Sequence, residues 1–297
     1  MGSRLGFPIA MIGADDGGGV RINGTLRQRQ LGRELRRLRE QAGLTLEEAA
    51  PRLDWSTSKL SRIEIGQQSV DVHGVRSMLD LYDVGGARWT EIIDLTREAR
   101  QKGWWHAYGV SDAGFVALET EAATVYDYQL AFVPGLLQTA DYARAVFRGS
   151  PVRRTEAEIE RAVQVRLRRQ RRLTEDPQLE LVTVVDETVL RRPIGGADAM
   201  QGQLRHLVRQ AALPSVCFQV VPVSVGPHQG LNGSFTVLGF AEPDEPAIAY
   251  LETAVNAAHV HKEAEVRGYK LVFDRLRSAA LSPRDSVALV ERLVDDL

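Results

Sequence analysis

Apolar positions near the start of the chain repeat at helical spacing. Leu31, Leu35 and Leu38 recur every three or four residues with arginines between them, and Gly43 ends the run. This pattern predicts an amphipathic helix that begins after Thr25. Residues 1–24 show neither helical nor strand periodicity and are rich in glycine, so we expect a disordered tail there.

A second, short helix is expected within residues 44–55. Thr45 and Glu48 have the spacing of a capping box, and Ala49 belongs to an apolar face that continues along this segment. Pro51 lacks a backbone N–H and lies inside the pattern, which predicts that the helix is short or kinked.

A third helix follows in "STSKLSRIEIG", residues 56–66. Ser56 is placed to cap it, Leu60 and Ile63 point inward, and Gly66 ends it. Two short helices joined by a tight turn describe a helix-turn-helix. Two more helices are expected in residues 72–84 and 87–101.

The sequence of residues 31–84 resembles the Xre-type, repressor-like helix-turn-helix. The positions that match its signature are Leu38, Arg39, Gly43, Leu44, Thr45, Glu48, Ala49, Leu53, Ser56, Ser58, Ser61, Ile63, Glu64 and Gly66. The resemblance implies a structural ion pair between Arg39 and Glu64. Leu46 departs from the pattern, because many members have a phosphate-binding glutamine there.

The resemblance also implies that the third helix is a recognition helix entering the major groove of double-stranded DNA by its N-terminus. The expected DNA-binding residues are Thr45, Ser56, Thr57, Ser58, Lys59, Ser61 and Arg62. Their hydroxyls would lie near base edges, and their cations would contact bases or phosphates. The alternative is an ordinary solvated helix face.

Charge supports DNA binding only locally. The whole chain has 37 basic and 39 acidic residues, a formal charge of −2. Between Arg27 and Glu64, nine cations face six anions, which gives +3. This local excess is the electrostatic footprint expected of a DNA-binding unit.

After about residue 103, helical and strand-like patterns alternate. Helices are expected near 115–123, 136–147, 153–173, 197–213 and 264–281, and strands near 124–133, 179–194, 216–223, 233–241, 247–253 and 257–263. The predicted fold is therefore multidomain: a tail over 1–24, an all-α headpiece over 25–100, and a mixed α/β (α+β) domain over 104–297.

Residues 104–290 resemble the C-terminal domain that follows Xre-type headpieces in an actinobacterial family. The stretches that carry this resemblance are 117–145, Phe218–Pro222, 233–240 and 273–283. Members are often described as antitoxin-like and are encoded beside a small protein, which implies a small partner protein here.

No catalytic signature is found in this half, so we expect no enzyme, no cofactor and no metal. His259 and His261 would share one face of a strand, but further ligands for a metal are not evident. A glycine-rich segment around His228 is either a binding loop or a mobile loop. The arginines of 153–173 would extend a DNA footprint, or they would belong to a solvated or partner-facing helix.

Two features bear on location and assembly. The single Cys217 and the lack of a long apolar run favour a cytoplasmic, nucleoid-associated protein with no membrane contact. Repressor-like proteins usually dimerise, and the segments "AFVPGLL" and "SVALVERLV" read as exposed apolar stripes for a homodimer.

The sequence favours a DNA-binding transcriptional regulator whose C-terminal domain binds a small partner protein and mediates dimerisation. One alternative makes this domain a small-molecule sensor, with Trp104, Trp105 and Tyr108 lining a pocket rather than packing in a core. A second alternative is an enzyme domain with a DNA-targeting headpiece.

Overall fold

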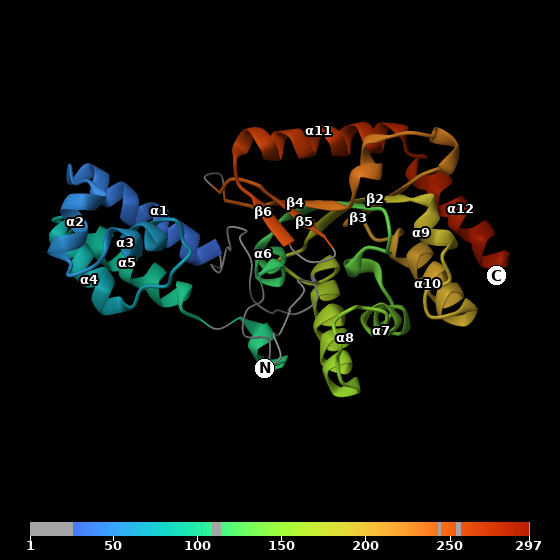
Figure 1. Ribbon diagram of the computed structural model, residues 1–297, viewed down its shortest axis with the longest axis horizontal. Coiled ribbons are helices and arrows are strands. Elements are labelled where there is room, and N and C mark those ends of the chain that lie inside the picture. Colours follow the sequence, from blue (N-terminus) through green and yellow to red (C-terminus); the bar gives the residue numbers. More distant parts are fainter. Residues whose placement is uncertain (1–25, 102, 109–113, 243–244, 254–256, 297) are drawn as a thin grey trace. The chain divides into compact units, whose positions relative to one another are not determined.

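The computed structural model describes residues 26–101, 103–108, 114–242, 245–253 and 257–296. The chain folds into two compact units, with the boundary between His106 and Ala107. The expected tail at 1–24 lies outside the described residues. The elements of both units are labelled in Figure 1.

The first unit is helical. Its α-helices are α1 (Leu26–Gln41), α2 (Leu46–Arg52), α3 (Thr57–Glu64), α4 (Val72–Leu81) and α5 (Gly86–Ala99). The 3-10 helix η1 (Trp104–Tyr108) includes the boundary between the two units. Local signals set several boundaries: Gly43 and Gly66 have φ of +72°, in the left-handed region that favours glycine. Leu35, Leu60 and Met78 are fully buried between the helices.

The second unit is built on a six-stranded mixed sheet in the order β3-β2-β1-β4-β5-β6. The strands are β1 (Thr124–Gln129), β2 (Glu180–Asp186), β3 (Val216–Val221), β4 (Phe235–Gly239), β5 (Ile248–Glu252) and β6 (Ala257–Val260). β1, β2 and β3 are parallel, whereas β4, β5 and β6 add antiparallel neighbours on the other side of β1.

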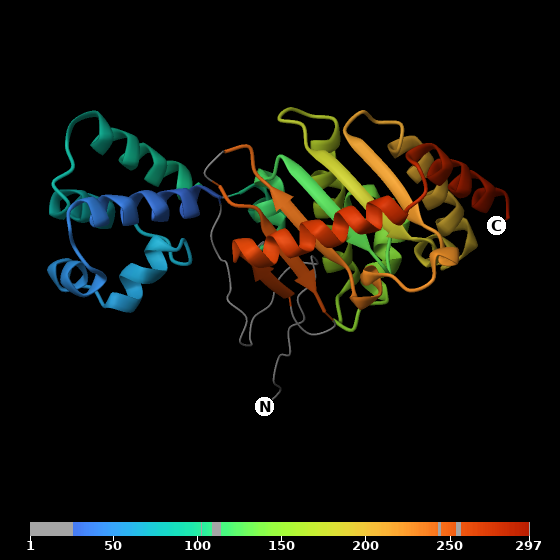
Figure 2. The same cartoon turned by 90° about the horizontal axis from the view of Figure 1, so that it is seen from above.

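Helices cover both faces of this sheet. They are α6 (Phe115–Glu121), α7 (Ala140–Arg148), α8 (Glu156–Gln170), α9 (Glu187–Arg191), α10 (Ala197–Gln210), α11 (Glu263–Ala279) and α12 (Pro283–Asp295). Short 3-10 helices are η2 (Gly135–Leu137), η3 (Arg171–Leu173), η4 (Val223–Val225) and η5 (Gln229–Asn232). α11 runs along one face, and α6, α7, α8 and α10 lie on the other (Figures 1 and 2).

The alternation of side chains along each strand explains how the sheet contributes to two cores. In β2, Leu181 and Val185 belong to the core under α10 and α12, whereas Val182 and Val184 belong to the core under α11. Successive side chains of a strand point to opposite faces, so both layers of helices are required to bury them. The all-α headpiece and this mixed α/β domain confirm the predicted fold class.

Three expectations for this unit need correction. The strand expected over 179–194 ends at Asp186, because the Asp186 side chain accepts a hydrogen bond from the backbone N–H of Thr188 and caps α9. α8 is not a wholly solvated or DNA-facing arginine helix, because Arg166 and Arg169 are 6% and 5% exposed.

The stripes "AFVPGLL" and "SVALVERLV" are not exposed either. Their large apolar side chains that lie inside the core of the C-terminal unit are Val133, Leu136, Leu137, Leu289, Val290 and Leu293, whereas Phe132 is 42% exposed. These segments therefore stabilise the unit itself. Within the described residues, no helix is long and apolar enough to cross a bilayer.

Candidate nucleic-acid interface

The turn between α2 and α3 is defined by two helix caps. Thr45 Oγ1 accepts a hydrogen bond from the backbone N–H of Glu48 at 3.2 Å, and Glu48 Oε2 accepts one from the backbone N–H of Thr45 at 2.8 Å. Ser56 Oγ accepts from the backbone N–H of Lys59 at 3.2 Å. Both helices therefore begin at the predicted residues, and α2 ends one residue after Pro51.

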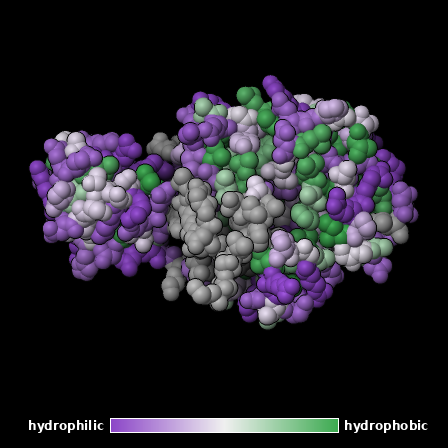
Figure 3. Space-filling model, in the orientation of Figure 1, coloured by the Kyte–Doolittle hydropathy of each residue, from purple (hydrophilic) through white to green (hydrophobic). Residues whose placement is uncertain are grey.

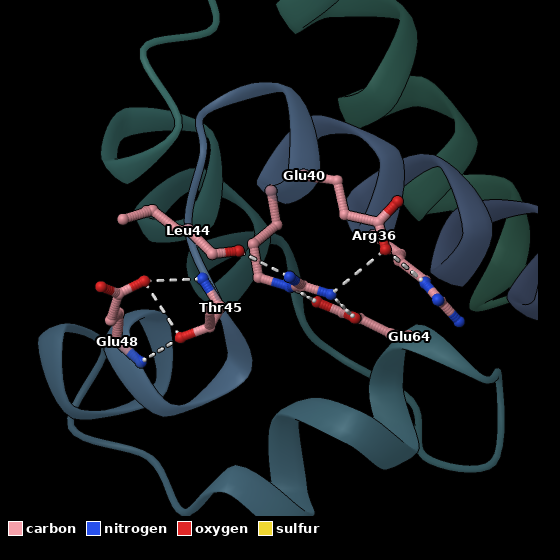
Figure 4. A network of polar contacts seen from close by, with 7 residues as sticks. Arg36, Glu40, Leu44, Thr45, Glu48 and Glu64 are labelled. Carbon is pink, nitrogen blue, oxygen red and sulfur yellow. Dashed lines mark hydrogen bonds and ion pairs between the residues drawn. The ribbon is translucent and has the colours of Figure 1, made fainter.

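A buried ion pair ties α3 to α1. Arg39 Nε and Nη2 donate to Glu64 Oε1 and Oε2 at 2.7 and 2.8 Å, and Arg39 Nη1 donates to the carbonyl of Leu44 at 2.6 Å (Figure 4). The two charged side chains are only 7% and 3% exposed. The hydrogen bond with Glu64 raises the pKa of Arg39, so this paired guanidinium remains charged.

Gly32 lets α1 and α3 approach closely. A Cβ atom at Gly32 would lie 2.5 Å from the carbonyl oxygen of Ile63 and 2.6 Å from that of Glu64. The sequence interpretation did not single out this residue. The available signal was a glycine inside an otherwise helical apolar pattern, which often marks close packing.

The predicted contact residues of α3 form its outer surface. Ser58 and Arg62 are exposed, and Thr57, Lys59 and Ser61 are half-buried. In the described part of the chain, no hydrogen bond engages the hydroxyls of Thr57, Ser58 or Ser61, which leaves them available to an external partner.

Two residues that were not predicted to bind DNA contact the cationic side chains of this surface. The Nζ atom of Lys59 lies 4.0 Å from the centre of the Trp55 ring, and Arg62 Nε donates to Gln68 Oε1 at 3.2 Å. Cation–π contact and the amide bond limit the side-chain freedom that binding would otherwise remove. Sequence reasoning missed Trp55 and Gln68, because their roles depend on three-dimensional contacts.

Comparison with protein families assigns both units. Residues 30–91 match a helix-turn-helix domain, and residues 113–292, more than half of the chain, match a domain of unknown function, DUF5753. The chain belongs to the DUF5753 family. Searches of curated proteins and of solved structures gave no match. The helix-turn-helix match makes the headpiece of this DUF5753 protein the DNA-binding domain of a regulator.

The histidines of the DUF5753 domain do not assemble a metal site in the described residues. His259 and His261 stack with their ring centres 6.5 Å apart, but no group of three or more His, Cys, Asp or Glu side chains is placed there to hold a metal ion. His228 lies beside the carboxyl end of β2, with Nε2 3.4 Å from Asp186 Oδ2.

The DUF5753 domain also contains a cavity of about 600 Å³ between the sheet and the helices of one face. Its described lining comes from α6, β1, the segment around η2, α7, α8, β4 and β5, and from the residues that follow α7 and α9. Trp104, Trp105 and Tyr108, which the sequence suggested for a pocket, are not among these residues. Arg166 and Arg169 do line the cavity, and burial together with nearby Arg169 lowers the pKa of Arg166 to about 9.

Proposed function

We propose that this protein is a sequence-specific transcriptional regulator that reads double-stranded DNA in the major groove with α3. The observation that carries the proposal is the exposed surface of a capped helix that is fixed to α1 by the Arg39–Glu64 pair. Ser58 and Arg62 contact base edges, while Lys59 and the N-terminal end of α3 at Ser56 contact phosphates. Thr45, Thr57 and Ser61 complete the interface.

The proposal includes a homodimer, because a single helix-turn-helix covers about half of a typical palindromic site. The visible face of the headpiece is mainly hydrophilic, whereas hydrophobic patches interrupt the surface of the C-terminal unit (Figure 3). Large apolar side chains exposed in that unit are Phe132, Val223, Val225, Leu231 and Leu271. We therefore assign dimerisation to the C-terminal unit.

In this proposal the DUF5753 domain binds rather than catalyses, and the protein acts on chromosomal DNA in the nucleoid. The resemblance to antitoxin-like regulators of the Xre type suggests a small partner protein as the bound molecule. The regulator would then report the presence of that partner through a change in DNA affinity.

A second candidate role for the same domain is the sensing of a small molecule. The cavity of about 600 Å³ favours it, because ligand pockets usually enclose roughly 300–1,000 Å³ and combine apolar walls with a few polar groups. Both roles leave the DNA-reading surface of α3 unchanged.

Selection of duplexes from a random-sequence pool by the full chain tests the DNA-reading role. We expect an enriched inverted repeat with half-sites about one helical turn apart. Ser58→Ala should relax the preference at a single position of each half-site, because edge contacts carry discrimination. Recovery of unenriched, random DNA by the wild-type protein would rule out sequence-specific reading.

A further inference from the structure

The cavity of the C-terminal unit has a wall that is mainly aromatic and aliphatic. The rings of Phe115 and Tyr250 contact each other in a tilted arrangement with their centres 4.5 Å apart, and Val146 and Leu136 also line the space. Each of these four side chains is at most 8% exposed. A wall of this kind favours the apolar body of a small molecule.

A buried ion pair supplies polar groups to the lining of the same cavity. Arg169 Nε and Nη2 donate to Glu119 Oε1 and Oε2, both at 2.6 Å, and both side chains are 5% exposed. This pairing uses two of the three nitrogens of the guanidinium. Within the described chain, Nη1 of Arg169 donates no hydrogen bond, and Arg169 is one of the residues that line the cavity.

Asp127, on β1, supplies an acceptor in the same cavity. Thr236 Oγ1 and Gln129 Nε2 both donate to its Oδ1 atom, at 2.7 and 2.9 Å. Its Oδ2 atom accepts no hydrogen bond from any described residue. Burial raises the pKa of Asp127 to about 6, which agrees with a carboxylate that has lost most of its hydration.

The formal charges of the described residues that line the cavity sum to zero. Its described lining contains three carboxylates and three guanidinium groups: Glu119, Asp127, Glu252, Arg166, Arg169 and Arg192. A charged ligand would leave one buried charge uncompensated, which is costly in a poorly hydrated site. An uncharged ligand avoids that cost.

We infer that this cavity binds an uncharged, mainly apolar small molecule whose polar end carries a hydrogen-bond acceptor beside a donor, as in an amide or a lactam. The acceptor receives the N–H of Arg169 Nη1, and the donor is directed at Asp127 Oδ2. The inference specifies the ligand class for the proposed sensing role and rests on that role for its biological meaning.

A matched pair of probes tests the polar requirement. 6(5H)-Phenanthridinone is an uncharged three-ring lactam, and its N-methyl derivative carries a methyl group in place of the N–H donor. We expect the lactam to bind the full chain with one-to-one stoichiometry and the N-methyl derivative to bind about tenfold more weakly, as for the loss of a hydrogen bond to a charged group. Calorimetric titration measures both affinities without DNA.

Asp127→Asn provides the specificity control. Its Oδ1 atom can still accept from Thr236 and Gln129, while the Nδ2 donor replaces Oδ2 and faces the N–H of the lactam. This variant should bind the lactam about tenfold more weakly and the N-methyl derivative with less than about a twofold change. Equal affinity of both probes for the wild-type protein would overturn the assignment.

Val146→Phe tests whether the probe binds within the cavity, and Val208→Phe is the matched control. Val146 lines the cavity, whereas Val208 is a partly buried valine of α10 outside its described lining. We expect binding to be lost only in Val146→Phe. Retained binding in a folded Val146→Phe variant, or no wild-type binding at about 1 mM lactam, contradicts the inference.

DNA affinity is then measured separately with and without the lactam. Lactam binding that leaves DNA affinity unchanged would support the ligand site and refute sensing of this ligand class. Loss of the ligand site would leave the DNA-reading role of α3 intact.

Discussion

At the scale of single residues, the headpiece depends on the buried carboxylate of Glu64, whose only ion-pair partner among the described residues is Arg39. Arg39→Ala would leave the buried carboxylate of Glu64 without its guanidinium, and breaking a buried pair in this way typically costs about 3–5 kcal/mol. We expect that loss in the free energy of opening measured by hydrogen exchange of headpiece amides.

Arg36→Ala is the matched control, because Arg36 forms an ion pair with Glu40 through a side chain that is 58% exposed. Such surface pairs contribute little to stability, so this variant should keep the stability of the wild type. If Arg39→Ala is equally stable and only binds DNA poorly, Arg39 is a phosphate contact rather than a structural residue.

Asp127 predicts a pH dependence of opposite sign to that of most carboxyl groups. Its pKa is raised to about 6 in the folded chain from an ordinary value of 3.8, so the folded state binds the proton more tightly than the unfolded state. The stabilising contribution of the protonated form is complete below about pH 4 and is lost as the pH rises through about 6.

We therefore expect Asp127→Asn to gain stability relative to the wild type between about pH 4 and pH 7, by up to about 3 kcal/mol. Urea unfolding of both full-length chains, followed by circular dichroism at each pH, measures this difference. A stability difference that is independent of pH would show that Asp127 keeps an ordinary pKa.

At the scale of secondary-structure elements, substitutions at the N-terminus of α3 distinguish effects on stability from effects on DNA affinity. Aspartate is as good an N-cap as serine, but its charge would lie where the proposal places a phosphate. Ser56→Asp should keep the thermal stability of the headpiece and lower its affinity for specific and random DNA alike by about tenfold. Ser56→Ala removes the cap instead and should lower the free energy of unfolding by about 1 kcal/mol.

If Ser56→Asp binds DNA as tightly as the wild type, the helix end does not face a phosphate. Hydrogen exchange across α3 in both variants shows whether the cap has been kept. Fluorescence anisotropy on a random duplex gives the affinity.

Elements defined by local signals could be predicted from the sequence, and those defined by distant partners could not. Thr45, Ser56 and Gly43 act within a few residues, so the caps and turns of the headpiece follow from the chain itself. The burial of Arg169 depends on Glu119, which lies 50 positions earlier in the sequence. The parallel pairing of β1 with β2 similarly spans a long crossover.

The cavity was beyond sequence reasoning for the same reason. Its polar wall joins Asp127 of β1, Thr236 of β4 and Arg169 of α8, and only the folded sheet brings these elements together. Arginines in a helix with exposed neighbours read as surface charges until their partners are known.

At the scale of the whole molecule, the account predicts that assembly depends on the C-terminal unit. Residues 1–100 alone should be monomeric and bind an operator weakly, whereas the full chain should be dimeric and bind a palindromic site. Light scattering of both chains and gel shifts on one and two half-sites measure this. A monomeric full-length chain that binds a single half-site tightly would exclude the dimer.

The central claim is that α3 reads base edges, and a base-pair scan of the selected site tests it most directly. The affinities of the wild type and of Arg62→Ala are measured for the site and for every single base-pair substitution within one half-site. The account predicts that Arg62→Ala loses about 1–3 kcal/mol of discrimination at one position and keeps it at the others. Uniform weakening at all positions and on random DNA would contradict it and would make Arg62 a phosphate contact.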